Sequence, residues 1–340
     1  MKIKSLIILL AMVAQTVSAQ SLFMKECRQR HFPKEIPPGN YSGITYLGHN
    51  DYAVVSDKSE EDGFFIFNIT VDSISGEIKD VRNRGFHGIG TRHGDLEGIA
   101  FDSSSGLLYL CSEAKSRIVE YDMKKKKPTG RTLDLTPYYI GMEGNGGMES
   151  LCLDKENRLL WTINEKPLRQ DATEGGYILR LKSFDMDFRN TATYMYRMDA
   201  SVASGNDGYT HVVGVSEVAA IGKGTLVILE REFYVPKIKV GAYCICKLYS
   251  VRPTEPYNIR NDHPANDDTR FLEKEKLTEW KTTLSLLGRS IANYEGMCMG
   301  SELENGNMTL ILVADSQNQF KGVLKDWFKS VVFSPIYIPS

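Results

Sequence analysis

The sequence of 340 residues lacks the motifs that mark several common enzyme classes. It has no Gly-x-Ser-x-Gly nucleophile elbow, no His-Glu-x-x-His zinc motif and no phosphate-binding P-loop. Its six cysteines show no zinc-ligand spacing. Helical periodicity is nearly absent, and so is the alternation of strands and helices that produces a parallel sheet. What remains is an all-β chain without a familiar catalytic motif.

A basic surface is also missing. Lysine and arginine together number 41 against 43 aspartates and glutamates, for a net charge of −2 at pH 7. General affinity for nucleic acid needs a basic surface, so we expect no nucleic-acid partner. The one basic cluster, Lys124–Lys127, precedes Pro128 between two strand-like segments, which is typical of a solvated hairpin tip.

The N-terminus has the pattern of a signal peptide. Lys2 and Lys4 precede the apolar run Leu6–Ala14, which is too short to span a bilayer. Val17-Ser18-Ala19 then supplies the small residues that a signal peptidase reads. We therefore predict cleavage after Ala19 and a secreted or periplasmic protein in which residues 20–340 form one domain. No later apolar run is long enough for a membrane helix, and no cysteine follows the cleavage site to carry a lipid anchor.

Five segments of the chain repeat one pattern. Each has a short apolar strand, usually opened by Glu and a small residue, then a polar turn and a second apolar strand that ends in Asp or Glu. The first strands contain Ser42–Thr45, Leu96–Ala100, Met148–Cys152, Ser216–Ala219 and Tyr294–Cys298. A third strand usually follows, and a fourth appears in places. Four antiparallel strands per unit, with steps of 52, 68 and 78 residues between the glutamates, predict the blades of a β-propeller.

Two further segments bear on this propeller. The longest step contains the polar stretch Glu255–Arg270, which we interpret as an inserted loop. The C-terminal strand Phe328–Tyr337 is expected to pair with N-terminal residues, because closure of the ring leaves no long sheet edge exposed. Five blades are readable in the sequence, and a sixth blade with a degenerate repeat remains an alternative.

The repeats bring acidic residues to matching positions. The first strand of each propeller blade lines the central channel, so the glutamates on these strands converge near the axis. That set is Glu97, Glu149, Glu217 and Glu295, with Gly43 in the first repeat. A second set, one strand further out, is Asp57, Glu113, Glu165, Glu230 and Asp315. Such carboxylates repel one another unless protons or cations neutralise them, and oxygen ligands suit a hard cation such as Ca²⁺. The alternative is that each glutamate only braces the backbone of the next blade.

Four of these segments resemble a known family. Asp95-Leu96-Glu97-Gly98-Ile99-Ala100, Gly147-Met148-Glu149-Ser150-Leu151, Leu226-Val227-Ile228-Leu229-Glu230-Arg231 and Asn293-Tyr294-Glu295-Gly296-Met297 are similar to motifs of the phytase-like domain family, also labelled "esterase-like activity of phytase". The resemblance covers roughly Gly39 to the C-terminus. It implies a secreted β-propeller, calcium-dependent, with esterase or phosphoesterase activity.

Two functions follow from these residues. The first is a metal-assisted hydrolase of a small-molecule ester or phosphoester, with a cation held by Glu97, Glu149, Glu217 and Glu295. Glu97, Glu217 and Arg231 are then the catalytic candidates: a free carboxylate acts as base, and Arg231 or Arg92 holds an anion. The second is a non-catalytic propeller that binds a ligand, glycan or protein and carries a structural cation. Arg92 also lies in an Arg-His-Gly match to histidine acid phosphatases, which we interpret as chance, because the downstream Arg and Pro of those enzymes are missing.

Overall fold

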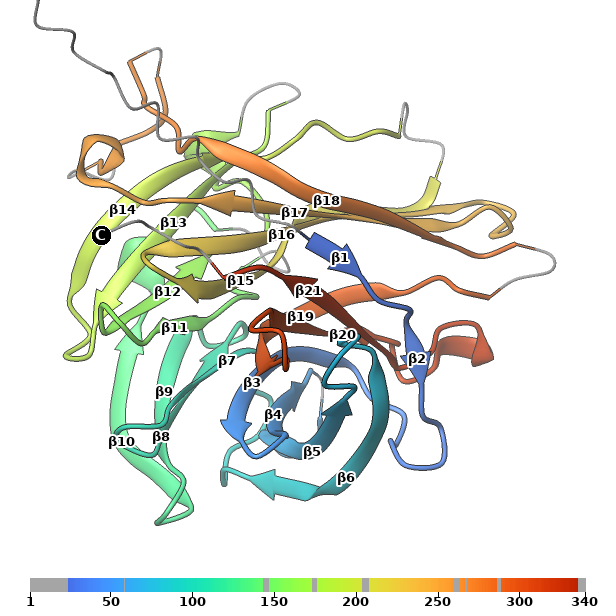
Figure 1. Ribbon diagram of the computed structural model, residues 1–340. Coiled ribbons are helices and arrows are strands. Elements are labelled where there is room, and N and C mark those ends of the chain that lie inside the picture. Colours follow the sequence, from blue (N-terminus) through green and yellow to red (C-terminus); the bar gives the residue numbers. More distant parts are fainter. Residues whose placement is uncertain are drawn as a thin grey trace, which may run out of the picture.

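The computed structural model describes residues 24–57, 59–142, 147–172, 176–203, 208–259, 263–266, 268–285 and 289–335. These residues form five antiparallel sheets around a central channel, which is a five-bladed β-propeller (Figure 1). The predicted all-β fold with four-stranded blades is confirmed, and the described chain contains five blades rather than six. The predicted signal peptide lies outside the described residues.

Each of the first four blades uses four consecutive strands. The first blade contains β3 (Tyr41–Gly48), β4 (Asp51–Ser56), β5 (Gly63–Val71) and β6 (Ile78–Gly88). The second contains β7 (Leu96–Asp102), β8 (Leu107–Ser112), β9 (Arg117–Asp122) and β10 (Lys127–Asp134). The third contains β11 (Cys152–Asp154), β12 (Leu159–Ile163), β13 (Ile178–Asp185) and β14 (Asn190–Arg197). The fourth contains β15 (Gly208–Gly222), β16 (Thr225–Pro236), β17 (Tyr243–Val251) and β18 (Lys274–Thr283).

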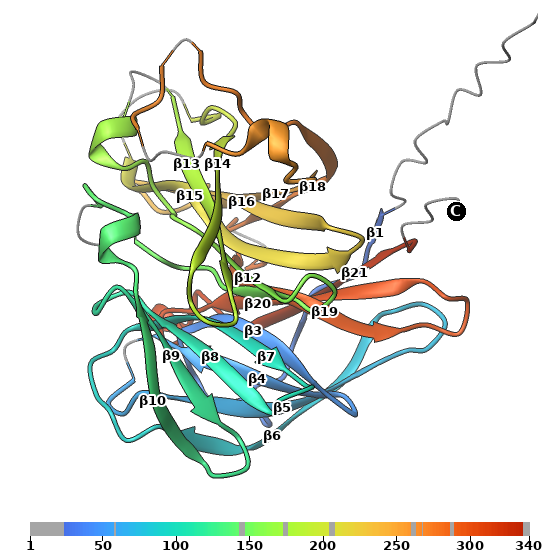
Figure 2. The same ribbon diagram turned by 90° about the vertical axis from the view of Figure 1, so that its left-hand side faces the viewer.

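The fifth blade joins both ends of the described chain. It contains β19 (Asn293–Glu302), β20 (Met308–Asp315), β21 (Trp327–Phe333), β1 (Met24–Glu26) and β2 (Arg30–His31). Met24 pairs with Phe333 and Arg30 pairs with Phe328, so N-terminal residues supply the outermost strand (Figure 2). The expected closure of the ring is therefore confirmed for Trp327–Phe333, and this pairing covers an edge that would otherwise be open.

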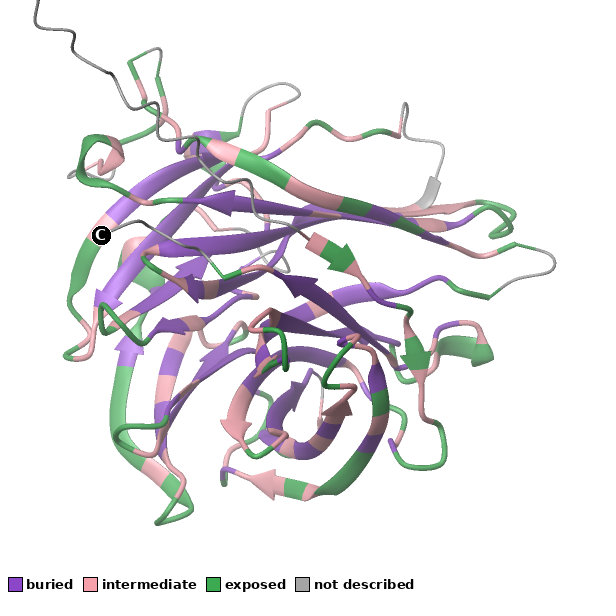
Figure 3. Cartoon of the chain, viewed as in Figure 1, coloured by how far each residue is buried: buried purple, intermediate pink, exposed green. Residues whose placement is uncertain are grey.

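The first strand of each blade surrounds the channel, and neighbouring first strands contact one another around the ring. Burial falls from the channel outward, and the fourth strands β6 and β10 have few buried residues (Figure 3). The remaining regular elements are short 3₁₀ helices, η1 (Thr136–Tyr138), η2 (Arg169–Asp171), η3 (Glu255–Tyr257) and η4 (Phe320–Gly322). In the part of the chain that the structure describes, no helix has the length and apolar character needed to cross a membrane.

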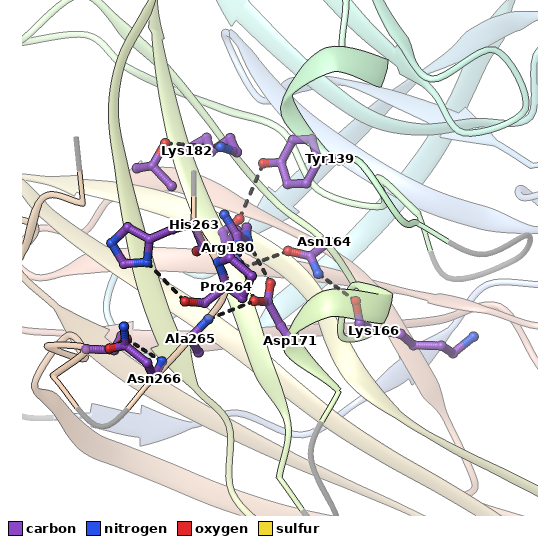
Figure 4. Close-up of polar contacts among 12 residues, drawn as sticks. Tyr139, Asn164, Lys166, Asp171, Arg180, Lys182, His263, Pro264, Ala265 and Asn266 are labelled. Carbon is purple, nitrogen blue, oxygen red and sulfur yellow. Dashed lines mark hydrogen bonds and ion pairs between the residues drawn. The ribbon is translucent and has the colours of Figure 1, made fainter. Parts of the chain in front are cut away.

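The inserted loop between β17 and β18 is tied to the third blade by a buried ion pair (Figure 4). Arg180 on β13 donates to Asp171 at 2.6 and 2.9 Å, and neither side chain is exposed. Arg180 also donates to the carbonyl of His263 at 2.9 Å, and Asp171 accepts the backbone N–H of Ala265 at 3.3 Å. The predicted insertion is thus confirmed, and its backbone satisfies a charged pair that burial would otherwise leave short of partners.

Candidate functional site

A β-bulge near the start of the inner strand points a glutamate into the channel in three blades. On β7, Leu96 pairs with Ser112 and Gly98 pairs with Cys111, which leaves Glu97 as the extra residue. Glu295 has the same place on β19, and Glu149 lies at the corresponding position just before β11. Because a bulge re-aims its extra residue away from the regular alternation, these three side chains meet in one cavity.

The second strands end at the same cavity. It has a volume of about 170 Å³, and seven carboxylates line it. They are Asp57, Glu97, Glu113, Glu149, Glu165, Glu295 and Asp315. Apart from Glu217 and Glu230, the two acidic sets that the repeats predicted at different depths therefore share one space. The extended ends of β15 and β16 form part of its wall through Thr210, Val212 and Phe233.

The fourth blade departs from the predicted alignment by one residue. On β15, Val215 pairs with Glu230 and Glu217 pairs with Leu229, so Ser216 is the bulge residue equivalent to Glu97. The alignment of Glu217 and Glu230 with the other acids was therefore wrong. The alignment of Gly43 with the glutamates was wrong too, because Ser42 takes the bulge position on β3. A signal was readable: the other three glutamates follow an apolar residue and precede a small one, whereas Glu217 follows Ser216 and precedes Val218.

Glu217 does not line the acidic cavity. Its side chain is 1% exposed, and its Oε1 accepts the backbone N–H groups of Leu151 at 3.2 Å and Val218 at 3.0 Å. The other blades carry Gly or Ser at this position, where inner strands approach closely: a Cβ on Gly296 would lie 2.2 Å from the carbonyl oxygen of Ser42. Glu217 thus links the third and fourth blades, as the bracing alternative described.

We expect Glu217→Ala to destabilise the protein by about 1–3 kcal/mol, because buried N–H groups lose their acceptor. The response of the melting temperature to Ca²⁺ should not change, because Glu217 lies outside the cavity lining. Thermal melts with Ca²⁺ and with EGTA measure both quantities. If a folded variant lost its Ca²⁺ response, Glu217 would be shown to contribute to the cation site.

Arg231 occupies the place at which the other four blades carry Asp57, Glu113, Glu165 or Asp315. Its Nη2 lies 2.6 Å from Glu165 and 3.8 Å from Glu149. Its Nη1 donates to Asn293 at 3.0 Å and contacts Glu295. We expected this guanidinium to hold a substrate anion. The structure instead gives it three carboxylate partners from the protein, and only 4% of its side chain is exposed.

Two carboxylates of this lining form a closer cluster with Asp95. One oxygen each of Asp57, Asp95 and Glu97 lies within 4.8 Å of the others. Ligand oxygens on one Ca²⁺ ion lie at most about 5 Å apart, because each Ca²⁺–oxygen distance is about 2.3–2.6 Å. The three residues therefore fit a hard cation, and a coordination number of about 6–8 would leave positions for water or substrate.

Burial and charge repulsion shift the titration of these groups. Burial raises the pKa of Glu97 well above its usual value, and the neighbouring carboxylates of Asp57, Glu295, Asp95 and Glu113 raise it further. Burial also raises the pKa values of Glu149, Glu295 and Asp315, although Arg231 lowers those of Glu149 and Glu295 in part. Without a cation, the cavity therefore holds protons at a pH where free carboxyl groups are ionised.

This cavity should make the metal-free protein less stable as pH rises. A carboxyl group whose pKa is higher in the folded than in the unfolded protein stabilises the fold fully below about pH 4.5. This stabilisation is lost as the pH rises through the folded-state pKa. We therefore expect the melting temperature in EGTA to fall between about pH 5 and 8, and Ca²⁺ to restore more stability at the upper end. A gap between the two melting curves that does not grow with pH would contradict this.

The sequence motifs missed Asp95 as a site residue. It precedes β7 in a left-handed conformation (φ 51°), which a non-glycine residue seldom adopts, and no pattern in the repeats marks it. Buried Asp62 holds the adjacent loop by accepting Gly94 N–H and Thr91 Oγ1, each at 2.7 Å. Arg92 lies exposed on the same loop, three residues before Asp95, and it does not line the acidic cavity.

Comparison with known proteins settles the family. Residues 36–317 match the family model described as "Phytase-like: Esterase-like activity of phytase". The chain belongs to this phytase-like family. The resemblance found in the sequence motifs is thereby confirmed. No curated protein matches the sequence.

Solved structures similar to this phytase-like chain are diverse. They include hydrazine synthase of Kuenenia stuttgartiensis, at 9% identity and a TM-score of 0.39, over 86% of this chain and 81% of that chain. The calcium structure of a family AA12 carbohydrate-active enzyme of Trichoderma reesei matches at 8% identity and a TM-score of 0.38, over 95% and 99%. A streptogramin B lyase structure matches at 11% identity and a TM-score of 0.37, over 93% and 99%. Likenesses at these scores carry no argument about activity.

Proposed function

We propose that this protein is an exported, Ca²⁺-assisted hydrolase of a small-molecule ester or phosphoester. The observation that carries the proposal is the cluster of Asp57, Asp95 and Glu97, whose oxygens fit one hard cation inside a cavity lined by seven carboxylates. The description of its family names an esterase-like activity, which supports the reaction class.

The basic residues of the lining contact the carboxylates of one wall. Arg231 and Lys166 both contact Glu165, at 2.6 and 2.9 Å. Arg231 also lies near Glu149 and Glu295, so those carboxylates already have a positive partner. The cluster around Glu97 has the carboxylates of Asp57 and Asp95 as its close neighbours, and a divalent cation would neutralise that repulsion.

The chain's own residues supply the remaining roles. A bound Ca²⁺ would polarise the ester carbonyl or phosphoryl oxygen and lower the pKa of a water molecule. Asp315 lies in the same cavity with a pKa raised by burial and by Glu295 and Asp57, so its carboxylate is suited to take the proton of that water. Arg231 pairs with the opposite carboxylates and holds their side chains in place. The small volume admits the reacting group, while the body of the substrate stays at the wall of β15 and β16.

The test is hydrolysis of p-nitrophenyl phosphate and p-nitrophenyl acetate by purified protein, with Ca²⁺ and with EGTA, beside elemental analysis of the protein. We expect bound Ca²⁺ and turnover that EGTA abolishes. Bound Ca²⁺ with no turnover of either substrate would favour the alternative, a ligand-binding propeller with a structural cation. Absence of metal and of a Ca²⁺-dependent melting temperature would overturn the cation site itself.

Export gives a separate prediction. The mature protein is expected to begin at Gln20, because a basic start, a short apolar run and small residues precede that position. Removal of the segment takes away two lysines and no acid, which changes the net charge from −2 to −4. Intact mass of protein recovered outside the cytoplasm measures this directly, and a retained Met1 would contradict it.

A further inference from the structure

A second cavity lies at the other end of the channel. It has a volume of about 400 Å³, and residues from all five blades line it. The acidic cavity is lined by the bulge residues of the inner strands. The second cavity is lined by residues that follow the bulge by two positions or more, for example Ile99 and Phe101 after Glu97. The same inner strands therefore supply carboxylates at one end of the channel and a different wall at the other.

This wall is apolar at an equivalent position in every blade. Four residues beyond the bulge position, the inner strands carry Tyr46, Phe101, Leu153, Ala220 and Met299. Their cross-strand partners follow the same register; for example, Phe101 pairs with Leu108 and Met299 pairs with Leu310. Ala220 is the only small residue of these five and leaves room in its blade.

Charge is nearly neutral around this cavity. Asp154 is buried and accepts the backbone N–H groups of Glu156 at 3.1 Å and Asn157 at 3.2 Å, so its carboxylate is used within its own turn. Lys155 and Glu156 are exposed neighbours of opposite sign. The two exposed charges thus have opposite sign, and most of the remaining lining is apolar or aromatic.

We propose that this cavity is a second binding site, which takes an uncharged aromatic molecule. Its volume lies in the range of about 300–1,000 Å³ that is usual for sites that bind drug-sized molecules, and such sites are lined mainly by apolar and aromatic side chains. Tyr46 and Phe101 supply aromatic rings to the wall, and the sulfur atoms of Cys152 and Met299 add polarisable surface. The site does not depend on the cation at the opposite end.

The test uses N-phenyl-1-naphthylamine, an uncharged aromatic fluorophore, titrated into the mature protein. We expect saturable binding to one site, unchanged by EGTA. Ala220→Phe fills the cavity and should weaken binding at least ~10-fold. Ile74→Ser and Ile238→Ser remove apolar side chains that are 72% and 80% exposed and lie outside the cavity lining, so they should not change binding.

Binding that does not saturate, or that Ala220→Phe leaves intact, would overturn the proposal, and so would its loss in either surface variant. Cys152 supplies a second readout if Ala220→Phe does not fold. It lines the cavity and is partly exposed, whereas the other five cysteines are buried. Bound fluorophore should slow the alkylation of Cys152 by N-ethylmaleimide, and peptide mass spectrometry measures the rate of this reaction. An unchanged rate at saturating fluorophore would show that the aromatic molecule binds elsewhere.

Discussion

Glu97→Gln is expected to remove the stabilisation that Ca²⁺ confers and to slow hydrolysis at least ~10-fold, the lower range for disturbed metal shells. Glutamine fills nearly the same volume but gives a neutral oxygen, so the cluster with Asp57 and Asp95 loses one of its three charges. In the parent protein, Ca²⁺ at about 100 times its Kd should stabilise the fold by about 2.7 kcal/mol. Melting curves and turnover, each with Ca²⁺ and with EGTA, measure the two effects.

The same variant should be no less stable than the parent in EGTA above about pH 5. Burial and the surrounding acids raise the pKa of Glu97, so a neutral side chain there relieves repulsion when no cation is present. Glu217→Gln is the matched control, because it makes the same change in a buried residue that only bonds backbone N–H groups. An equal Ca²⁺ shift in Glu97→Gln and the parent would disprove the site. A lost shift with full turnover would assign the cation a structural role.

Arg231→Met is expected to destabilise the protein by about 3–5 kcal/mol at neutral pH, the usual effect of removing one partner of a buried ion pair. Methionine fills much of the same volume but leaves Glu149, Glu165 and Glu295 without the guanidinium that they share. The loss should shrink toward pH 4, because protonated carboxyl groups need no counter-ion. Denaturant unfolding at several pH values measures this.

Arg158→Met provides the control for a generic arginine loss. Arg158 lies 2.9 Å from Asp102, but 45% of its side chain is exposed, so its pair should contribute no more than about 1 kcal/mol. If Arg231→Met proves as mild as this control, or its effect is the same at every pH, then the guanidinium does not offset the charge of these carboxylates, and its place in the mechanism would need revision.

Much of the propeller was predictable because blade formation depends on local sequence. Apolar strands separated by polar turns recur five times, and each hairpin pairs neighbours in the chain. Closure was predictable too, since an unpaired β21 would leave an exposed edge. The count of five blades needed the structure, because a degenerate sixth repeat and the insertion at Glu255–Arg270 would have looked alike in sequence.

The sequence by itself determined that acidic residues converge at the channel, and it named Glu97, Glu149 and Glu295 among them. Only the tertiary structure decided which acids share the cavity, because a bulge of one residue decides whether a side chain enters the channel or braces a neighbouring blade. Because of that one-residue shift in the fourth blade, Glu217 lies outside the acidic cavity and Arg231 lines it. It also took the fold to bring Asp57 beside Asp95 and Glu97, since residues about 40 apart in the chain meet only where two blades pack together.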